Sequence, residues 1–503
     1  YSAALPYTKL FVPTVDTVRF AYVLKAQLEL LHPVFFTGVT GTGKTVIVQN
    51  LIEEASDLSY DRGTRMTPIL ITFSAQSSAI DTQGMIENNL QKKRKTLLGA
   101  PTGTQVTIFV DDVNMPAVEE YGAQPPIELL RQFVDHAGFY DRQRLFWKDI
   151  ESSVLCCGAA PPGGGRNDLT PRFSRHFHIM CVPPATDQVL TTIFGSILGG
   201  FLQAFTKDCQ SLVQSIADAT VDIYNRMCET MKPTPAKSHY TFNLRDLSKV
   251  FQGLHGASPE LISNPADYIR LWVHECLRVF HDRLINDEDR GWFKTTVAAK
   301  VKQFFKKDWA SDVRGDNEVM LFGNFADPRS LKKPYGEIRD HEALQKVMVN
   351  YLEDYNQTNP KTMNLVLFQN AVEHIARISR VINQPFGNAL LVGVGGSGRK
   401  SLTTLAVSIA EFELFQVEIS KGYGKVEWRE DLKRMLRLAG EQLKNTVFLF
   451  SDTQIVMESF VEDINNILNN GEVPNLFEMD ERVEILEAMT NYSQSIGRVC
   501  NGP

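Results

Sequence analysis

One octapeptide constrains the fold of this chain more than any other feature. Residues 38–45 read Gly-Val-Thr-Gly-Thr-Gly-Lys-Thr and satisfy the pattern GxxxxGK[ST]. An apolar run from Val34 to Phe36 precedes the octapeptide, and an apolar helical pattern over residues 46–52 follows it. A strand, a glycine-rich loop and a helix in this order form the loop that wraps phosphate groups in nucleotide-binding proteins. The chain is therefore predicted to contain an α/β domain with a phosphate-binding loop.

The pattern assigns a task to each residue type in this loop. Glycines let backbone N–H groups turn inward around phosphate oxygens, and the helix N-terminus adds its positive dipole end. Lys44 is expected to neutralise the β- and γ-phosphates, and Thr45 to offer a hydroxyl to Mg²⁺. The residues expected to contact the nucleotide are Gly38, Thr40, Gly41, Thr42, Gly43, Lys44, Thr45 and Val46. We therefore expect ATP or ADP with Mg²⁺ as the cofactors.

Composition narrows the class of protein. The 503 residues leave room for about three to four domain-sized units, and 43% hydrophobic with 22% charged residues is typical of a globular protein. The 52 basic and 59 acidic residues give a net charge of −7, so neither nucleic acid nor a membrane surface is an expected partner. The seven cysteines form no CxxC pair, which suits a reducing compartment such as the cytoplasm. Tyr1 is not a start residue, and we expect a piece of a longer chain without a secretory signal.

The pattern of apolar runs changes along the chain. Residues 1–195 alternate helical patterns with short apolar runs at 68–73, 106–110 and 153–157, which predicts a parallel sheet covered by helices. Residues 196–305 carry helical periodicity and are predicted to form a small helical subdomain. Residues 306–360 are mixed and charged and are predicted to be a connector. Residues 361–503 are predicted to be a second, incomplete sheet domain.

The second domain carries an altered copy of the first loop. A predicted strand at 388–392 leads into Gly-Val-Gly-Gly-Ser-Gly-Arg-Lys-Ser, in which Gly393 and Gly398 follow Gly38 and Gly43 by 355 residues. Arginine replaces the phosphate-binding lysine, and a lysine, which cannot coordinate a cation, replaces the metal-binding hydroxyl. Ser401 would supply that hydroxyl only if the loop shifted its register. We expect a degenerate site, binding-only or empty, made by Gly393, Gly395, Gly396, Ser397, Gly398, Arg399, Lys400 and Ser401.

Acidic residues follow the strand at 106–110. Asp111 is expected to hold Mg²⁺, and Asp112 stands where a glutamate usually orients the attacking water. Aspartate is one methylene shorter, so slow hydrolysis and simple binding are both open, and an Asx turn that caps the strand is the structural alternative. Lys44, Asp111 and Asp112 are thus the candidate catalytic residues, and Thr45 and Asp111 the candidate metal ligands. The corresponding strand at 447–450 ends in Ser451 and Asp452, so a serine replaces the metal-holding aspartate.

Three arginines are further candidates. Arg172 and Arg175 follow the fourth strand, where they would reach a neighbouring module's γ-phosphate or pair with surface carboxylates. Arg245 opens a helix in the helical subdomain and would touch phosphate from the far side, or lie solvated beside a carboxylate. Residues 161–166 are predicted to be a mobile turn, and Ala159 and Ala160 leave no polar sensor at the strand end before it. The basic run at 92–95 is predicted to be a helix C-terminus that faces water.

Taken together, these motifs resemble the third and fourth AAA+ modules of a dynein heavy chain of the axonemal type. The resemblance spans nearly the whole chain and implies tandem P-loop modules, each with a parallel sheet domain and a helical small subdomain, the second truncated. Residues 12–19, the first loop, 109–116, 161–167, 387–399, 451–455 and 468–477 carry it.

The resemblance implies more than the residues do. In that family six modules form one ring, and the third is a regulatory nucleotide site. Adenine would lie near Val12 and Pro13, and Arg245 matches the family's sensor arginine. Arg172 or Arg175 would face the preceding module's nucleotide.

The implied parent protein is an ATP-driven, minus-end-directed microtubule motor of the axoneme of cilia and flagella. It would bind microtubules through a coiled-coil stalk outside this chain, and intermediate and light chains through a tail. The other AAA+ modules of the same heavy chain would be partners, and whether this stretch itself hydrolyses ATP is left undecided.

Two other functions fit the residues. One is an independent AAA+ ATPase whose first site turns over unaided. The other is a giant AAA+ remodelling protein of the ribosome-assembly kind, which the acidic charge balance does not support. Asp112 and the missing polar sensor argue against fast turnover at the first site. Lys400 is unusual even for the axonemal pattern.

Overall fold

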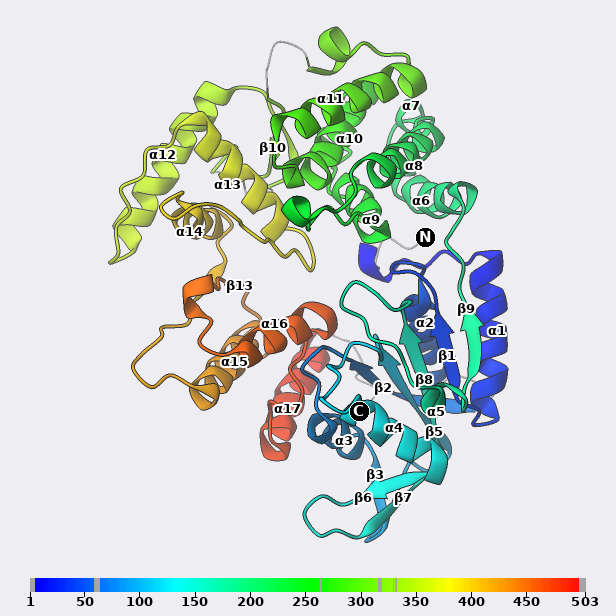
Figure 1. The fold of residues 1–503 in the computed structure, drawn as a ribbon. Coiled ribbons are helices and arrows are strands. Elements are labelled where there is room, and N and C mark those ends of the chain that lie inside the picture. The colour runs from blue at the N-terminus through cyan, green and yellow to red at the C-terminus, as the bar shows by residue number, and fades with distance from the viewer. Residues whose placement is uncertain are drawn as a thin grey trace. The chain divides into compact units, whose positions relative to one another are not determined.

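The computed structural model describes residues 5–57, 64–262, 264–314, 319–328, 330 and 333–496. The chain forms two compact units, which are drawn together in Figure 1. The sheet unit comprises Thr14–Pro184, Val417–Leu443 and Phe450–Pro503. The helical unit comprises Tyr1–Pro13, Ala185–Gln416 and Lys444–Leu449.

A five-stranded sheet forms the centre of the sheet unit, in the order β2-β5-β8-β1-β9. All neighbouring strands are parallel, and Val34 of β1 lies opposite Cys156 of β8 on one side and His178 of β9 on the other. The strands are β1 (Val34–Thr37), β2 (Arg65–Thr72), β5 (Thr104–Asp111), β8 (Ser153–Ala159) and β9 (His178–Cys181). The sheet confirms the predicted α/β class, and its strands cover the apolar runs expected in residues 1–195. Because all five strands run the same way, their carboxyl ends share one edge, where ligands bind in such sheets.

Helices cover both faces of this sheet (Figure 1). Side chains alternate between the faces of a strand. Val34 and Phe36 therefore join the core under α1 and α2, while Phe35 joins the core under α3 and α4. Each helix buries an apolar face against one side of the sheet. The helices are α1 (Val15–Glu29), α2 (Lys44–Ser56), α3 (Ala79–Asn88) and α4 (Pro125–His136).

A second, four-stranded sheet lies beside this core in the order β3-β4-β7-β6. Its strands are β3 (Gln91–Arg94), β4 (Leu97–Gly99), β6 (Gly138–Tyr140) and β7 (Trp147–Glu151). The basic run at 92–95 was predicted as a helix C-terminus, and this prediction is wrong. Its residues are exposed on β3, which pairs antiparallel with β4.

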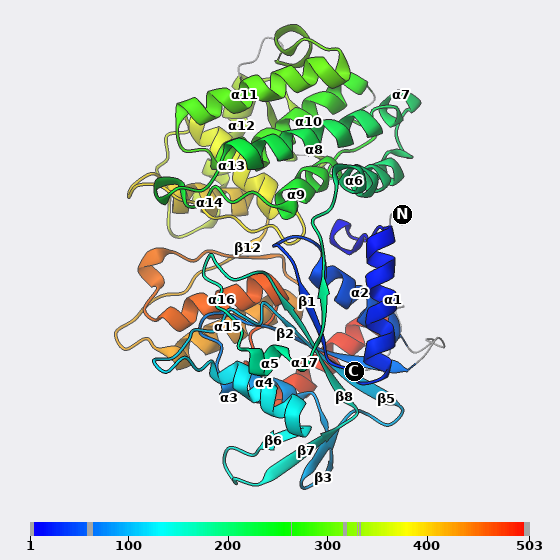
Figure 2. The same ribbon diagram turned by 45° about the vertical axis from the view of Figure 1, so that its right-hand side comes forward.

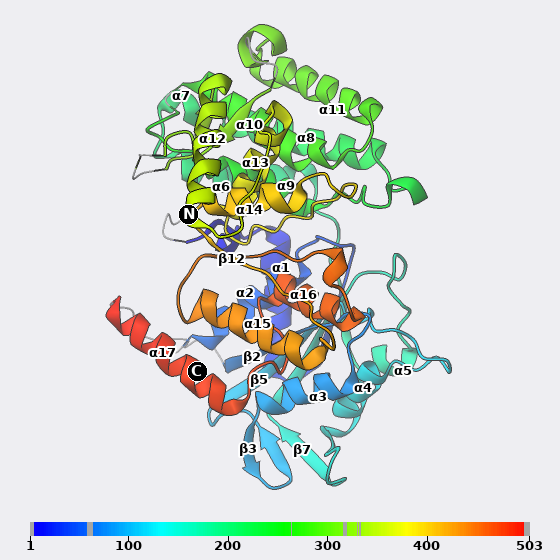
Figure 3. The ribbon, with the colours of Figure 1, turned by 90° about the vertical axis from the view of Figure 1, so that its left-hand side faces the viewer.

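The remaining elements of the sheet unit come mainly from the C-terminal part of the chain. Helices α15 and α16 lie side by side (Figure 3), and the ring of Trp428 stacks on that of Phe460 at a centroid distance of 4.4 Å. These elements are α5 (Pro171–Ser174), α15 (Lys425–Gly440), η6 (Asp452–Gln454), α16 (Glu458–Asn470) and α17 (Met479–Ser495).

The helical unit has its own core. Trp272, Tyr268 and Phe251 are fully buried in it, and helices α6 and α8 pack together (Figure 2). Its first part contains η1 (Tyr7–Lys9), α6 (Asp187–Leu202), α7 (Lys207–Gln210), α8 (Val213–Thr230), η2 (Pro235–Lys237), α9 (Leu244–Leu254), α10 (Pro265–Val279), η3 (His281–Arg283) and α11 (Asp287–Lys300). Two π-helical turns follow, η4 (Val301–Phe305) and η5 (Trp309–Arg314). Among the described residues no helix is both long and apolar enough to cross a membrane.

The second part of the helical unit begins inside the predicted connector, which contains a helix of 18 residues. Helices α13 and α14 pack against each other and share a core with α12. This part contains β10 (Leu321–Gly323), β11 (Gly336–Ile338), α12 (His341–Thr358), α13 (Gln369–Ile382), α14 (Arg399–Ile409), β12 (Glu413–Phe415) and β13 (Thr446–Phe448). β12 and β13 pair in parallel, as their counterparts β2 and β5 do in the sheet unit.

The strand predicted at 388–392 is absent from the structure. Leu390 and Val392 are 90% and 85% exposed and belong to no strand. In the first module the equivalent strand β1 pairs with β8 on one side and with β9 on the other. Among the described residues segment 388–392 pairs with no strand, and an apolar run alone does not make a strand.

Candidate nucleotide-binding site

The first glycine-rich loop connects the end of β1 to the start of α2, at the carboxyl edge of the parallel sheet. Gly41 and Gly43 both have φ 87°, in the left-handed region that favours glycine. A Cβ on Gly38 would lie 2.5 Å from the carbonyl oxygen of Val182, which follows β9. Glycine is therefore required at position 38 by close approach and at 41 and 43 by backbone conformation.

Lys44 and Thr45 open α2, where the helix N-terminus favours anions. The Lys44 ammonium donates hydrogen bonds to the carbonyl oxygens of Gly38 (2.8 Å) and Val39 (2.9 Å), so its side chain is folded along the loop. Burial lowers the pKa of Lys44, and the nearby carboxylates of Asp111 and Asp112 act in the opposite direction.

Two predicted metal ligands meet in the structure. The Thr45 hydroxyl donates a hydrogen bond of 2.5 Å to Oδ2 of Asp111, the last residue of β5. A hydroxyl and a carboxylate oxygen side by side are the hard donors that Mg²⁺ takes at sites where phosphate supplies further ligands. The residues therefore fit a Mg²⁺–nucleotide complex held by Thr45 and Asp111, with Lys44 as the phosphate cation.

Asp112 occupies a left-handed conformation with φ 50° directly after the strand, and its N–H donates to Oδ1 of Asp111. Burial, and next the charge of Asp111, raise the pKa of Asp112, whereas Arg166 lowers it. The Arg166 guanidinium forms this ion pair through Nη2, 3.6 Å from Oδ1 of Asp112. The predicted water-orienting carboxylate is thus held by a cation of the same module.

Arg166 is the residue of this site that the sequence reasoning missed. Residues 161–166 were expected to be a mobile turn, and no role was given to the arginine that ends it. Its charge also lowers the pKa of Lys44, although less than burial does. The signal in the sequence was the run of three glycines before the arginine, which allows a sharp turn back toward the sheet edge.

Arg172 and Arg175 lie away from the loop residues in sequence, in and after the short helix α5. Arg175 is 66% exposed, lies 3.9 Å from Asp135, and donates a hydrogen bond to His176. Arg172 is exposed. Both are therefore available at the surface of the sheet unit, and their contact with another module's nucleotide stays a prediction.

Arg245 begins α9 in the helical unit, where Asn243 caps the helix by accepting from the Arg245 N–H at 2.9 Å. The neighbouring carboxylate of Asp246 pairs with Arg283 at 2.8 Å rather than with Arg245. The Arg245 side chain is exposed, and the structure gives it no carboxylate partner among the described residues. Loose pairing with a carboxylate, one alternative for this arginine, is therefore absent there.

The segment with the predicted adenine contacts Val12 and Pro13 also belongs to the helical unit. Just before it, the Tyr7 hydroxyl donates to the carbonyl oxygen of Ser248 at 2.9 Å, and its ring meets that of His255 edge to face. The N-terminal segment is thus packed on α9, the helix that Arg245 opens. The roles of Val12, Pro13 and Arg245 at the first loop stay predictions, because these residues belong to the helical unit.

The second loop repeats the backbone of the first with different side chains. Gly396 (φ 80°) and Gly398 (φ 77°) match Gly41 and Gly43, and α14 begins directly after Gly398. The Arg399 guanidinium donates to the carbonyl oxygen of Val394 at 3.3 Å, the counterpart of the bond from Lys44 to Val39. Lys400, at the position of Thr45, is exposed. The loop conformation is kept, and the metal-binding hydroxyl is lost.

Ser451 has a structural task of its own. Its N–H and hydroxyl both donate to Oε1 of Gln454, at 2.7 and 3.0 Å, and so it caps the short helix η6. The serine that stands in the position of the metal-holding aspartate is therefore engaged in local backbone structure.

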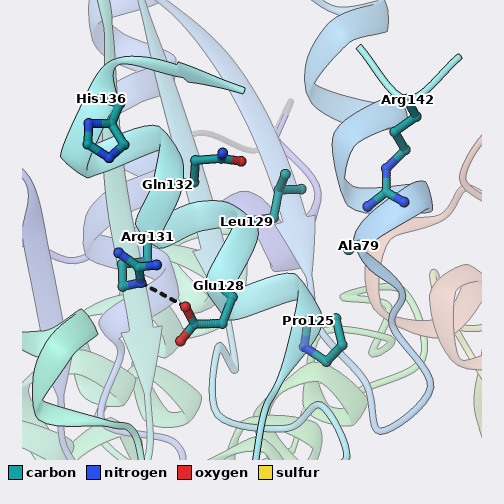
Figure 4. A pocket seen from close by; sticks show the side chains of 8 residues that line it. All are labelled: Ala79, Pro125, Glu128, Leu129, Arg131, Gln132, His136 and Arg142. Carbon is teal, nitrogen blue, oxygen red and sulfur yellow. Dashed lines mark hydrogen bonds and ion pairs between the residues drawn. The ribbon is translucent and has the colours of Figure 1, made fainter. Parts of the chain in front are cut away.

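A pocket of about 440 Å³ opens elsewhere on the sheet unit, along α4 (Figure 4). Its lining residues are Ala79, Pro125, Glu128, Leu129, Arg131, Gln132, His136 and Arg142. Arg131 is bound to Glu128 at 2.7 Å, and Arg142 donates to Gln83 at 2.9 Å. None of the predicted nucleotide-binding residues lines this pocket, so it is distinct from the phosphate-binding loop.

Three family models match the chain. Residues 1–185 match the model described as a P-loop containing dynein motor region, and residues 363–499 match the P-loop containing dynein motor region D4. Residues 216–314 match an AAA+ lid domain.

The chain is also similar to curated dynein heavy chains. The chain is 47% identical over 500 residues to dynein axonemal heavy chain 6 of Homo sapiens, which covers 99% of this chain and 12% of the relative. It is 45% identical over 504 residues to dynein axonemal heavy chain 1 of Mus musculus, covering 98% of this chain and 12% of that protein. The chain thus spans about an eighth of the length of the relatives it matches.

Proposed function

The chain belongs to the dynein heavy chain family, and we propose that it supplies one regulatory and one structural nucleotide site to an ATP-driven motor. The first loop binds ATP or ADP with Mg²⁺ through Lys44, Thr45 and Asp111. The second loop binds nucleotide without Mg²⁺, or none. The predicted division into a sheet domain (1–195), a helical subdomain (196–305), a connector (306–360) and a second sheet domain (361–503) is part of this proposal.

One observation carries the proposal for the first site. Thr45 and Asp111 are 66 residues apart in the sequence, yet their side-chain oxygens lie 2.5 Å apart at the carboxyl edge of the sheet. A hydroxyl from the loop and a carboxylate from the neighbouring strand are the pair that such a metal–phosphate site requires. The Mg²⁺ ion would neutralise phosphate charge and polarise the phosphoryl oxygens when bound.

The residues of the chain favour slow hydrolysis at this site. Asp112 is shorter than the usual glutamate, and Arg166 holds its carboxylate in an ion pair. Ala159 is the last residue of β8 and Ala160 follows it, at the place where a polar side chain would contact the nucleotide. A site that binds tightly and turns over slowly is suited to regulation by its resident nucleotide.

At the second site the changes concern the metal. Arg399 keeps a cation on the loop. Its guanidinium donates to the carbonyl oxygen of Val394, which is equivalent to the Val39 carbonyl that accepts from Lys44 in the first loop. Lys400 offers no metal ligand in place of Thr45, and Ser451 replaces the Asp111 carboxylate by an uncharged hydroxyl that donates to Gln454 of η6. The site can attract phosphate through Arg399 without binding Mg²⁺.

The function of the longer protein follows from the family and is proposed with it. We propose a motor of the axoneme in cilia and flagella that moves on microtubules. Its partners would be the other AAA+ modules of the same heavy chain, microtubules through a coiled-coil stalk, and intermediate and light chains through a tail. Arg172 and Arg175 would serve the preceding module's nucleotide, and Arg245 would contact the phosphates of the first site.

The test is calorimetric titration of the full chain with ATP and with ADP, in Mg²⁺ and in EDTA. Lys44→Ala is expected to weaken one class of site by about 100-fold, since it removes a charge-assisted contact to phosphate. Lys232→Ala, at an exposed lysine of the helical unit, is the matched control and should bind as the unaltered chain does. Unchanged binding in Lys44→Ala would overturn the assignment of the first site.

A further inference from the structure

The three glycines before Arg166 fix where its side chain lies. Gly163, Gly164 and Gly165 have φ values of 116°, 60° and 88°, a conformation that other residues rarely adopt in succession. The turn closes on itself, because the N–H groups of Gly163 and Arg166 donate to each other's carbonyl oxygens at 3.1 and 3.3 Å. Arg166 is thereby returned toward the strand end that carries Asp112.

Hydrogen bonds tie this turn to the strand end. The Asn167 N–H donates to the carbonyl oxygen of Asn114 at 2.9 Å, and its side chain donates to that of Pro116 at 2.8 Å. In return the Asn114 side chain, which is 2% exposed, donates to the carbonyl oxygen of Ala160 at 2.9 Å. The expected mobile turn is thus fastened to the turn after β5 on both sides of Arg166.

Arg166 is only partly satisfied in this position. Its Nη2 pairs with Asp112 at 3.6 Å, and its buried Nε has no hydrogen-bond partner within the described part of the chain. A guanidinium has five N–H donors in a fixed fork, so this one has donors to spare for a second anion. The carboxylate it holds follows directly on Asp111, which is bound to Thr45 at the metal side of the loop.

We infer that Arg166 is the residue that detects the γ-phosphate at the first site. Without a γ-phosphate it pairs with Asp112, and with ATP it moves to the γ-phosphate and releases Asp112. It replaces the polar side chain that Ala159 and Ala160 lack. This inference rests on the proposed nucleotide site and adds a residue that distinguishes ATP from ADP.

The exchange links recognition to chemistry. A phosphate group carries more charge than one carboxylate and accepts a forked pair of N–H bonds, so it competes well for the guanidinium. The same movement frees the Asp112 carboxylate to take a proton from a water molecule as the water oxygen bonds to the γ-phosphorus, while the bond from that phosphorus to the bridging oxygen breaks and ADP leaves. Arg166 thus acts as a phosphate contact, and its pairing keeps Asp112 occupied when ADP is bound.

The test compares Arg166→Gln with the unaltered full chain. The affinities for ADP and for the non-hydrolysable analogue adenylyl imidodiphosphate are measured in the presence of Mg²⁺, at the site that Lys44→Ala removes. The analogue is expected to bind about tenfold more weakly to Arg166→Gln, and ADP within about twofold of its original affinity. Arg142→Gln, at an exposed arginine of the sheet unit whose Nε donates to Gln83, is the control and should leave both affinities unchanged.

A second variant predicts the opposite sign. Asp112→Asn removes the competing carboxylate, so the analogue should bind about threefold to tenfold more tightly, because Arg166 no longer has to leave an ion pair. The gain should disappear when Arg166→Gln is present as well. Because the analogue is not hydrolysed, slower turnover cannot produce this gain.

Three results would contradict the inference. Equal weakening of ADP and analogue in Arg166→Gln would mean that the arginine only supports the fold of the loop. If Arg166→Gln binds the analogue and ADP in the same ratio as the unaltered chain, Arg166 does not contact the γ-phosphate. If the tighter binding in Asp112→Asn persists when Arg166→Gln is also present, Arg166 does not move between Asp112 and the γ-phosphate. If the unaltered chain shows no Lys44-dependent binding, the proposed site falls together with this inference.

Discussion

Thr45 and Lys400 occupy equivalent positions in two loops with the same backbone, so in the proposed function one side chain separates a metal site from a site without metal. The Thr45 hydroxyl lies 2.5 Å from the Asp111 carboxylate, whereas Lys400 is exposed. A lysine ammonium has only donors and cannot coordinate a cation. The difference between the two sites is therefore a matter of oxygen ligands rather than of loop conformation.

Replacement of Thr45 by valine tests this directly. Thr45→Val keeps the shape of the side chain and removes the hydroxyl, so nucleotide affinity in Mg²⁺ should fall to the value measured in EDTA. Thr192→Val is the matched control, because the exposed Thr192 lies on α6 of the helical unit and its hydroxyl donates to the carbonyl oxygen of Gln188 on the same helix. Titration of both variants with ATP decides the matter, and a Thr45→Val chain that keeps its Mg²⁺ dependence would show that other oxygens hold the metal.

Helices α9, α10 and α13 meet at a buried carboxylate in the helical unit. Glu275 on α10 is fully buried, accepts from Nε of Arg380 on α13 at 2.9 Å, and accepts from Tyr335 at 3.1 Å. Gly253 on α9 makes room for it, because a Cβ there would lie 1.8 Å from Oε2 of Glu275. The ion pair between Glu275 and Arg380 therefore joins α10, expected to belong to the first module, to α13, expected to belong to the second.

Loss of this charge should loosen α10 and α13. Glu275→Gln leaves the buried Arg380 guanidinium without its counter-ion, which costs about 3–5 kcal/mol. Amide hydrogen exchange of α10 and α13, followed by mass spectrometry, should then show protection lower by roughly 100-fold to several thousand-fold. Glu353→Gln, at an exposed position of α12, should have no effect. Unchanged protection in Glu275→Gln would mean that the ion pair does not hold these helices together.

The pH dependence of the same pair has a defined sign. Burial alone would raise the pKa of Glu275, but Arg380 and His274 bring it down from 4.5 to about 2. Because the folded pKa lies below the unfolded one, the stabilisation is fully present above about pH 4.5 and is lost as the pH falls toward 2. Protection of α10 should therefore decline across this interval in the unaltered chain and stay flat in Glu275→Gln.

Apolar runs and spacing predicted the parts of the fold that depend on local sequence. The strands ending at Thr72, Asp111 and Ala159 and the loop before Lys44 were found where expected. The prediction at 388–392 failed because a strand needs partners, and among the described residues no strand pairs with this run. The basic run at 92–95 failed because its pairing with β4 outweighs helical preference. The position of Arg166 depends on three left-handed glycines and on Asn114, whose joint effect no local pattern reveals.

Across the full chain, two glycine-rich loops share a backbone, and we propose that only the first, with Thr45 and Asp111, holds Mg²⁺ with its nucleotide. Arg399 keeps a phosphate cation at the second loop, while Lys400 and Ser451 remove the metal ligands. The chain would thus bring a switchable site and a fixed one to the same motor.

The most direct test is a density map of the full chain with ATP and Mg²⁺, at a resolution that distinguishes ATP from ADP and shows the ion. We predict nucleotide at Lys44 with Mg²⁺ beside Thr45 and Asp111. At Arg399 we predict either no nucleotide or a nucleotide without metal. A well-ordered Mg²⁺–ATP complex at the second loop, or none at the first, would contradict this prediction.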